Sequence, residues 1–198
     1  KRDKKIKKYF KDQKVNVNTF NGSLLWEPWN IAKKDGTPYK VFTPYYRKGC
    51  LNSDNPRIPL PAPNLSNLIS IDNHDLTIED LELMPKHNWY NKMTSLWSPG
   101  EDGALNKIEE FISNGLNNYK EGRNFPSNQN VSQLSPHLHF GEVSPNQVWY
   151  RAKTKEGKLG IKKDLDHFLS ELGWREFSFN LLYHFPFLPK KNLQKKFD

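Results

Sequence analysis

The stretch FLSELGWREFSFNLLYHFP, residues 168–186, limits the possible folds of this chain most strongly. Its apolar residues lie on nearly every side of a helix, and a helix of that kind is normally buried inside a protein. A carboxylate, an indole and a guanidinium nevertheless stand in its middle, at Glu171, Trp174 and Arg175. Offsets of three and four residues bring these side chains to one helix face. The sequence therefore predicts a long buried helix that carries a charged and aromatic stripe.

Two interpretations of the stripe remain open from spacing alone. Phe168 and Ser178 extend it by one turn in either direction, so it is long enough to line a ligand cavity. The same spacing fits a core in which Glu171 and Arg175 form a buried ion pair and Trp174 fills space. Opposite charges four residues apart are ordinary neighbours on helices, so spacing by itself favours the second interpretation.

Composition and charge narrow the class of protein. The 198 residues carry a net charge of +8. This charge favours a polyanionic partner such as nucleic acid. It is equally explained by an AT-rich genome, which encodes Lys and Asn often. Aromatic residues make up 13% of the chain, which argues against a disordered protein. Cys50 is the single cysteine, so we expect a reducing compartment, the cytoplasm. No apolar run reaches the length of a membrane span or a signal peptide, and the missing initial Met indicates a fragment of a longer protein.

Local patterns divide the chain into segments. Residues 1–13 indicate the basic end of a helix, and the β-branched alternation in residues 15–29 predicts a short strand and a loop. Asp-Gly and two prolines predict a loop over residues 33–49. Residues 52–92 are rich in Pro, Asn and Asp, and a stretch of that length without periodicity is typical of an interdomain connector.

From about residue 100 the pattern becomes helical. Ser98, followed by Pro99 and Glu101, predicts the capped start of one helix, and Ser144 with Pro145 predicts the start of another. A third helix is the long apolar stretch described above, which prolines close. The second half of the chain is therefore expected to be all-α.

The segment YKEGRNFPSNQNVSQLSPHLHFGEVSP, residues 119–145, holds further candidate site residues. Hydroxyls and free backbone N–H groups around a proline turn suit a phosphate, although Ser-Pro caps are common in helices without ligands. His137 and His139 alternate in the same segment. No Cys, Asp or Glu cluster with metal-ligand spacing accompanies them, so we expect packing roles and no metal site.

These motifs together resemble the photolyase/cryptochrome family. WSPGEDGALNKIEEF, YKEGRNFP, SQLSPHLHFGEVSPNQVW and FLSELGWREFSFNLLYHFP occur in this order and are similar to the family's flavin-binding half. LLWEPW and PYKVFTPYYR are similar to the end of its N-terminal α/β antenna domain. The resemblance, closest to class I cyclobutane pyrimidine dimer photolyases, implies an α/β remnant over residues 1–50 and a connector over 51–92. Residues 93–198 would be the first half of the mainly all-α FAD-binding domain.

The resemblance also implies a function. Photolyases bind FAD and use the reduced, light-excited flavin to pass an electron to a pyrimidine dimer flipped out of DNA. The expected activity is light-driven repair of cyclobutane pyrimidine dimers, a carbon–carbon lyase reaction, by a monomeric protein that binds damaged DNA and no membrane. The complete protein is expected to carry an antenna chromophore of the folate or deazaflavin type. The alternatives are a cryptochrome-type blue-light receptor without repair activity, a (6-4) photolyase and, outside the family, a helical nucleic-acid-binding module.

Residue roles carry over from the family by position, and they imply that the stripe on residues 168–178 lines a cavity rather than a packed core. Glu171 and Trp174 match the catalytic pair that contacts the dimer, by a hydrogen bond to its base edge and by stacking. Arg123 and Ser178 complete the expected DNA-binding set. The expected cofactor-binding set is Tyr119, Val131, Ser132, Gln133, Leu134, Ser135, Phe168 and Arg175.

The loop expected to hold the FAD phosphates departs from the family pattern. Val131 stands where a threonine is usual, so one hydroxyl donor is missing. We expect Ser132 and Ser135 to supply more of the hydrogen bonds. Later segments that complete the flavin pocket in the family are absent here, so the piece alone is expected to bind FAD weakly and to be inactive.

Overall fold

A computed structural model describes residues 2–69, 77 and 79–197 of the chain, and these residues form helices and connecting segments without a β-strand. The α-helices are α1 (Arg2–Asp12), α2 (Phe42–Pro44), α3 (Asn91–Thr94), α4 (Glu101–Glu110), α5 (Tyr119–Gly122), α6 (Ser135–Phe140), α7 (Pro145–Lys153) and α8 (Lys162–His184). Short 3₁₀ or π-helical turns cover Pro28–Asn30, Tyr45–Gly49, Cys50–Asn52, Glu79–Leu81, Phe111–Gly115 and Lys195–Phe197.

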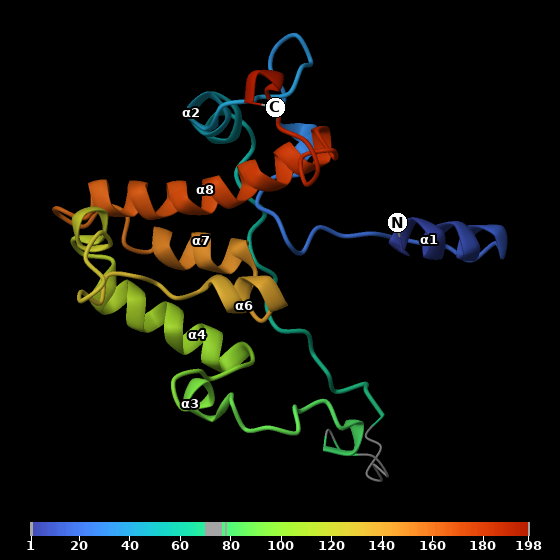
Figure 1. Ribbon diagram of the computed structural model, residues 1–198, viewed down its shortest axis with the longest axis horizontal. Helices are drawn as coiled ribbons and strands as arrows, with labels where there is room; N and C mark the ends of the chain where they lie inside the picture. The colour runs from blue at the N-terminus through green and yellow to red at the C-terminus, as the bar shows by residue number, and fades with distance from the viewer. Residues whose placement is uncertain (1, 70–76, 78, 198) are drawn as a thin grey trace.

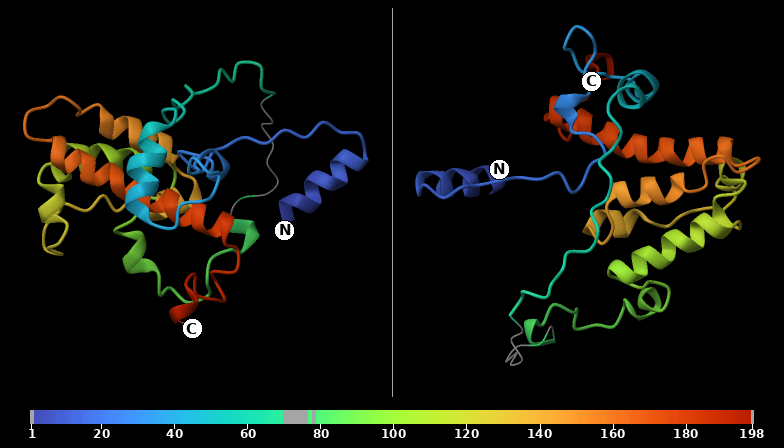
Figure 2. Two further views of the ribbon diagram at one scale, coloured as in Figure 1. Left: turned by 90° about the horizontal axis from the view of Figure 1, so that it is seen from above. Right: turned by 180° about the vertical axis from the view of Figure 1, so that it is seen from behind.

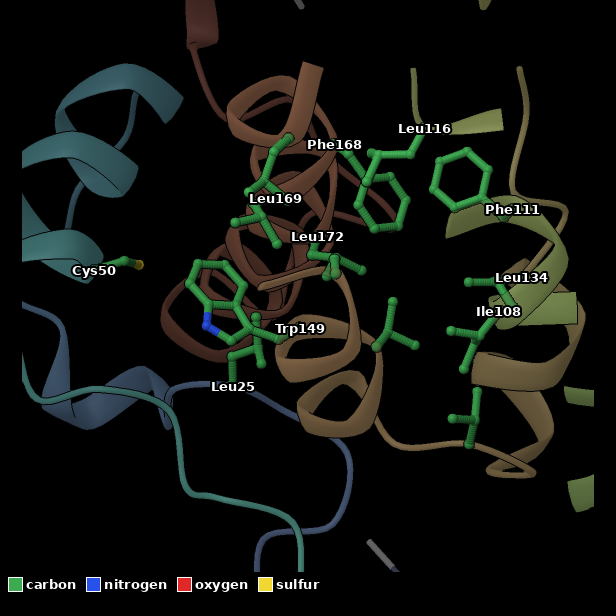
Figure 3. Packing of buried hydrophobic residues seen from close by; sticks show 14 of the residues in the cluster. Leu25, Cys50, Ile108, Phe111, Leu116, Leu134, Trp149, Phe168, Leu169 and Leu172 are labelled. Carbon is green, nitrogen blue, oxygen red and sulfur yellow. The ribbon is translucent and has the colours of Figure 1, made fainter. Parts of the chain in front are cut away.

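Helix α8 is the central element of the packed part. Figure 1 shows α7 and then α4 following α8 as successive layers, with α6 beside α7, and the view from behind in Figure 2 agrees. The rings of Phe168 on α8 and Phe111 at the end of α4 lie 4.7 Å apart between these layers (Figure 3). The predicted long helix is confirmed. Its burial is partial, because nine of its residues are buried whereas Trp174, Phe179, Leu182 and Tyr183 are exposed.

Helix α1 lies apart from this core. None of its residues is buried, and both views of the chain show it reached by an extended segment (Figures 1 and 2). The predicted helix at the start of the chain is confirmed. In the described residues no helix combines the length and apolarity needed to cross a bilayer.

The strand predicted over residues 15–29 is wrong. Side chains take the backbone donors that a neighbouring strand would need: the Asn21 carboxamide oxygen accepts from the N–H groups of Ser23 and Leu24. The Glu176 carboxylate accepts from those of Leu25 and Trp26. A strand forms only where its backbone groups pair with another strand, so this segment stays irregular. The α/β character expected for residues 1–50 is accordingly not seen.

Two further local predictions need correction. The loop predicted over residues 33–49 ends at residue 41, because Tyr45 and Tyr46 bury their rings from a helical segment that runs through residue 52. The helix predicted to start at Ser98 begins at Glu101, and its N-cap is Gly100 with a φ of 95°. Only glycine adopts that conformation without strain.

The second predicted helix start is confirmed. The Ser144 hydroxyl accepts from the N–H of Gln147, and the Gln147 side chain accepts from the N–H of Ser144, with Pro145 at the first helical position. This reciprocal pair satisfies two donors that a helix start otherwise leaves free. The expected boundaries near residues 50 and 92 stay a prediction, and residues 70–76 and 78 of the expected connector lie outside the described part.

Glu176 joins the N-terminal half to α8. Its side chain is 1% exposed, and its carboxylate accepts from the N–H groups of Leu25 at 2.8 Å and Trp26 at 3.3 Å and from the Arg175 guanidinium at 3.0 Å. Burial raises the pKa of Glu176 to about 7, although these three donors favour the charged form. The carboxylate therefore holds the segment around residue 25 against the helix at an electrostatic cost.

This raised pKa predicts a pH-dependent stability. The folded chain holds the Glu176 proton up to about pH 7, whereas the unfolded chain releases it near 4.5. Protonation of Glu176 therefore adds ~3 kcal/mol to the free energy of unfolding below pH 4.5, and this stabilisation is lost as the pH rises to about 7. Urea unfolding across this range should show that fall in the unsubstituted chain and not in Glu176→Gln.

The matched control is Glu109→Gln, which removes an exposed carboxylate paired with Arg151. Its pH profile should follow that of the unsubstituted chain. If the free energy of unfolding of Glu176→Gln falls with pH as steeply as that of the unsubstituted chain, the assignment of the pH dependence to this residue is contradicted.

Gly173 lets a tyrosine ring lie directly on α8. A Cβ at this position would stand 2.5 Å from Cδ2 of Tyr46, whose ring is almost fully buried. Gly173→Ala is expected to lower the free energy of unfolding by about 1–3 kcal/mol, because ring or helix must shift. Gly22→Ala, where a Cβ meets no atom within 4 Å, is the control for denaturant unfolding. Equal midpoints for the two variants would argue against a tight contact at Gly173.

Candidate functional site

A cleft of about 850 Å³ opens between α8 and the segment that leads into α6. This volume lies in the range usual for small-molecule sites. Residues from α5, α6, α8 and the N-terminal half contribute to its walls. They are Ser23, Tyr119, Val131, Ser132, Gln133, Leu134, Ser135, Leu138, His139, Phe168, Glu171, Leu172, Arg175 and Phe179.

All eight residues of the predicted cofactor-binding set line this one cleft. Tyr119, the loop of residues 131–135, and α8 are separate in the sequence, and the packing of α5, α6 and α8 brings them together. Glu171 of the predicted catalytic pair lines the cleft as well. The roles of these residues stay predictions, while their convergence on one cavity is a feature of the fold.

The face of α8 toward the cleft is mixed in character. Phe168, Leu172 and Phe179 give it an apolar wall, and Glu171 and Arg175 give it opposite charges. Offsets of three, four and seven residues from Phe168 explain why most of these side chains share a face. The apolar positions 172 and 179 continue a visible helical pattern and could have been predicted as lining residues.

The loop of residues 131–135 forms the opposite wall. Leu134 is 3% exposed and anchors the loop in the core. Gln133 has a φ of 54°, a left-handed conformation that non-glycine residues rarely adopt. Ser132 and Ser135, before and after this turn, line the cleft, whereas Val131 brings no hydroxyl to it.

Arg123 and Glu171 form an ion pair at the edge of the cleft. The Arg123 Nη1 atom lies 2.5 Å from Glu171 Oε1 and 3.3 Å from the Tyr119 hydroxyl. His167, one turn before Glu171, stands 3.7 Å from the same carboxylate oxygen. The hydrogen bond that Arg123 donates to the Glu171 carboxylate raises the pKa of Arg123, so a fixed cation stays at this edge.

Arg175 is held from behind by two groups. Its Nη1 atom donates to the Ser23 carbonyl oxygen at 2.7 Å and to the Glu176 carboxylate at 3.0 Å. Its guanidinium carbon lies 5.0 Å from the centre of the Phe179 ring. These contacts fix a guanidinium at the cleft wall. Neither Ser23 nor Glu176 was predicted, since only the fold brings residue 23 to α8.

Trp174 does not line the cleft, contrary to the prediction of one cavity-facing stripe. A residue three positions after Glu171 is turned about 60° to one side of it, and one four positions after it about 40° to the other side. Arg175 therefore faces the cleft, whereas Trp174 stacks on Phe42 and stays 46% exposed. Ser178 follows Trp174 to this outer side, where its hydroxyl donates to the Trp174 carbonyl.

The two neighbouring histidines have different surroundings. His137 is 1% exposed, contacts the Glu142 carboxylate and stacks on Trp97 at 4.2 Å between ring centres. A packing role was expected for it, and these contacts describe one. His139 is exposed and belongs to the cleft wall, which the sequence did not indicate.

Known proteins resemble this chain in sequence and in structure. The deoxyribodipyrimidine photo-lyase of Agrobacterium fabrum (strain C58) is 38% identical over 99% of this chain and 41% of its own length. Cryptochrome-2 of Arabidopsis thaliana is 31% identical over 97% of this chain and 33% of its own length. A crystal structure of a bacterial class III photolyase from Agrobacterium tumefaciens matches with a TM-score of 0.84 and 37% identity, covering 99% of this chain and 40% of that one. The family model for DNA photolyase matches residues 1–64.

The chain belongs to the DNA photolyase/cryptochrome family. It spans about two fifths of the length of the Agrobacterium photo-lyase and of the solved class III photolyase. The expected resemblance to class I stays a prediction, and the solved structure that matches this chain is a class III photolyase. The helical fold is therefore shared with a solved photolyase. Residues 1–50 contain no strand in the part that the structure describes.

The Arg123–Glu171 ion pair is expected to contribute little to stability. Both side chains are about 30% exposed, and ion pairs near the surface contribute at most about 1 kcal/mol. Glu171→Gln should therefore change the free energy of unfolding by less than ~1 kcal/mol in urea titrations. Glu121→Gln, which removes the exposed partner of Lys163, is the control. A loss of several kcal/mol in Glu171→Gln alone would show that the pair holds the fold together.

Proposed function

We propose that the complete protein containing this chain repairs cyclobutane pyrimidine dimers in DNA, using light and a bound FAD. The observation that carries the proposal is the cleft, where Tyr119, the loop of residues 131–135, Phe168 and Arg175 meet. The identity to a photo-lyase supports an enzyme of this class. The acting form is a monomer bound to damaged DNA.

The cleft has the chemistry that a folded FAD needs. Phe168, Leu172 and Phe179 offer an apolar wall to a planar ring, and the hydroxyls of Ser132 and Ser135 suit phosphate oxygens. Arg175 places a fixed cation on the same cavity, where it can balance a pyrophosphate or a reduced flavin. A reduced flavin bound there supplies an electron when it absorbs light.

The protein's own residues bind and orient the damaged nucleotides. The exposed ring of Trp174 offers a stacking surface to a base that has left the duplex. Glu171 lines the cleft one helical turn before Trp174, where its carboxylate can accept a hydrogen bond from a base edge. Arg123, fixed on Glu171, places a cation for a neighbouring phosphate.

A cryptochrome-type receptor without repair activity is the second candidate. The 31% identity to Cryptochrome-2 supports it. The two candidates share the flavin cleft and differ in what the outer side of α8 binds. A lesion-binding role for Glu171 and Trp174 favours repair, so these residues decide between the candidates.

The test uses the complete protein, loaded with FAD and reduced. It is incubated with an oligonucleotide that carries one thymine dimer, under blue light and in the dark, and the restored thymines are quantified. We expect repair only in the light, and a loss of at least about tenfold in Trp174→Ala and in Glu171→Ala, since base stacking and a hydrogen bond to a charged group are each worth a factor of this order.

Trp29→Ala is the matched control, because Trp29 is also exposed and contacts an aromatic residue of α8, Tyr183, away from the cleft. It should repair normally. Bound flavin without repair in any light would contradict the proposal and favour the cryptochrome-type candidate. Binding to intact DNA as strong as to damaged DNA would favour a non-specific nucleic-acid-binding module.

A further inference from the structure

Phe42 and Trp174 form the closest ring stack in the described chain. Their ring centres are 3.7 Å apart, and the ring planes differ by 13°. Phe42 begins α2, whereas Trp174 stands in the middle of α8. One face of the Trp174 indole is thus covered by a residue from the N-terminal half.

Phe42 is itself fixed in place. The ring of Tyr46 also stacks on it, parallel within 9° at 5.5 Å, and Tyr46 is 1% exposed. Gly173 leaves the room that this tyrosine ring needs against α8. Phe177 closes the side, with its ring edge-on to both Phe42 and Trp174 at 6.0 Å. The stack Tyr46–Phe42–Trp174 therefore runs from the core to the surface and ends at Trp174.

The outer end of this stack is open. Trp174 is 46% exposed, and Phe42 and Phe177 are its ring neighbours among the described residues. A large exposed aromatic side chain normally samples several rotamers, and fixing it on binding costs conformational entropy. A ring that is already stacked on one face and open on the other avoids that cost.

We propose that Phe42 is a positioning residue that holds the Trp174 indole as a ready platform for a flipped pyrimidine pair of damaged DNA. The inference rests on the proposed function, in which Trp174 stacks on the lesion. It adds that the platform is built by the N-terminal half of the chain through Phe42 and Tyr46. Phe42 acts through Trp174 and need not touch the DNA.

The test measures binding in the dark, with the complete FAD-loaded protein and two fluorescent oligonucleotides that differ by one thymine dimer. Phe42→Leu removes the ring and keeps an apolar side chain, and Phe42→Tyr keeps the ring. We expect Phe42→Leu to weaken binding of the dimer-bearing oligonucleotide by roughly fivefold and binding of the intact one hardly at all. Phe42→Tyr should restore lesion binding to within about twofold, because the stacking ring is present again.

A double-substitution cycle separates positioning from general packing. In a Trp174→Ala background, Phe42→Leu should cause no further loss, because the platform that it orients is gone. Tyr183→Leu is the matched control, since Tyr183 also lies on α8 and is a ring neighbour of another exposed tryptophan, Trp29. It should leave discrimination between the two oligonucleotides unchanged. Retained flavin absorbance and a cooperative unfolding transition confirm that each variant is folded, and Phe42→Met replaces Phe42→Leu if that variant does not fold.

The outcomes distinguish this inference from the proposed function. If Trp174→Ala weakens lesion binding and Phe42→Leu or Phe42→Met does not, the positioning role is overturned and the proposed function stands. Equal losses for the damaged and the intact oligonucleotide, or the same loss in the Trp174→Ala background, also overturn the positioning role. If Trp174→Ala binds the lesion normally, the role of Trp174 in the proposed function fails and that of Phe42 fails with it.

Discussion

The buried carboxylate of Glu176 is the group on which the junction of the two halves depends. It takes up the N–H groups of Leu25 and Trp26, which no neighbouring strand pairs in the described residues. An unpaired buried donor would cost about 1–3 kcal/mol, so the carboxylate replaces the missing strand for this segment. Its own burial is unfavourable, and the adjacent Arg175 guanidinium offsets part of that cost.

The same junction shapes the cleft from behind. With the segment around residue 25 held on α8, the Ser23 carbonyl reaches Arg175 and fixes its guanidinium at the cavity wall. The helical segment that follows brings Phe42 and Tyr46 to the other side of α8. The N-terminal half thus supports both sides of the helix, the cation of the cleft on one and the exposed tryptophan on the other.

Most of the helical part could be predicted from sequence because its signals are local. Apolar periodicity and the Ser144–Gln147 capping pair lie within a few residues of the elements that they define. The strand predicted over residues 15–29 failed for the opposite reason. Its alternation is real, but a strand also needs a partner, and side chains of Asn21 and Glu176 take the donors instead. A cap at Ser98 likewise fits the local pattern, yet the chain turns at Gly100.

The sequence by itself determined that this chain has a long helix with a charged and aromatic stripe, and its motifs determined the family and the set of cofactor-binding candidates. Only the tertiary structure decided how the stripe divides. The segments packed around α8 place Glu171 and Arg175 at the cleft and Trp174 on Phe42. It also decided which distant residues support them, Ser23 behind Arg175 and Phe42 on Trp174. Helical spacing fixes relations over one or two turns, whereas contacts between segments more than a hundred residues apart depend on how the whole chain packs.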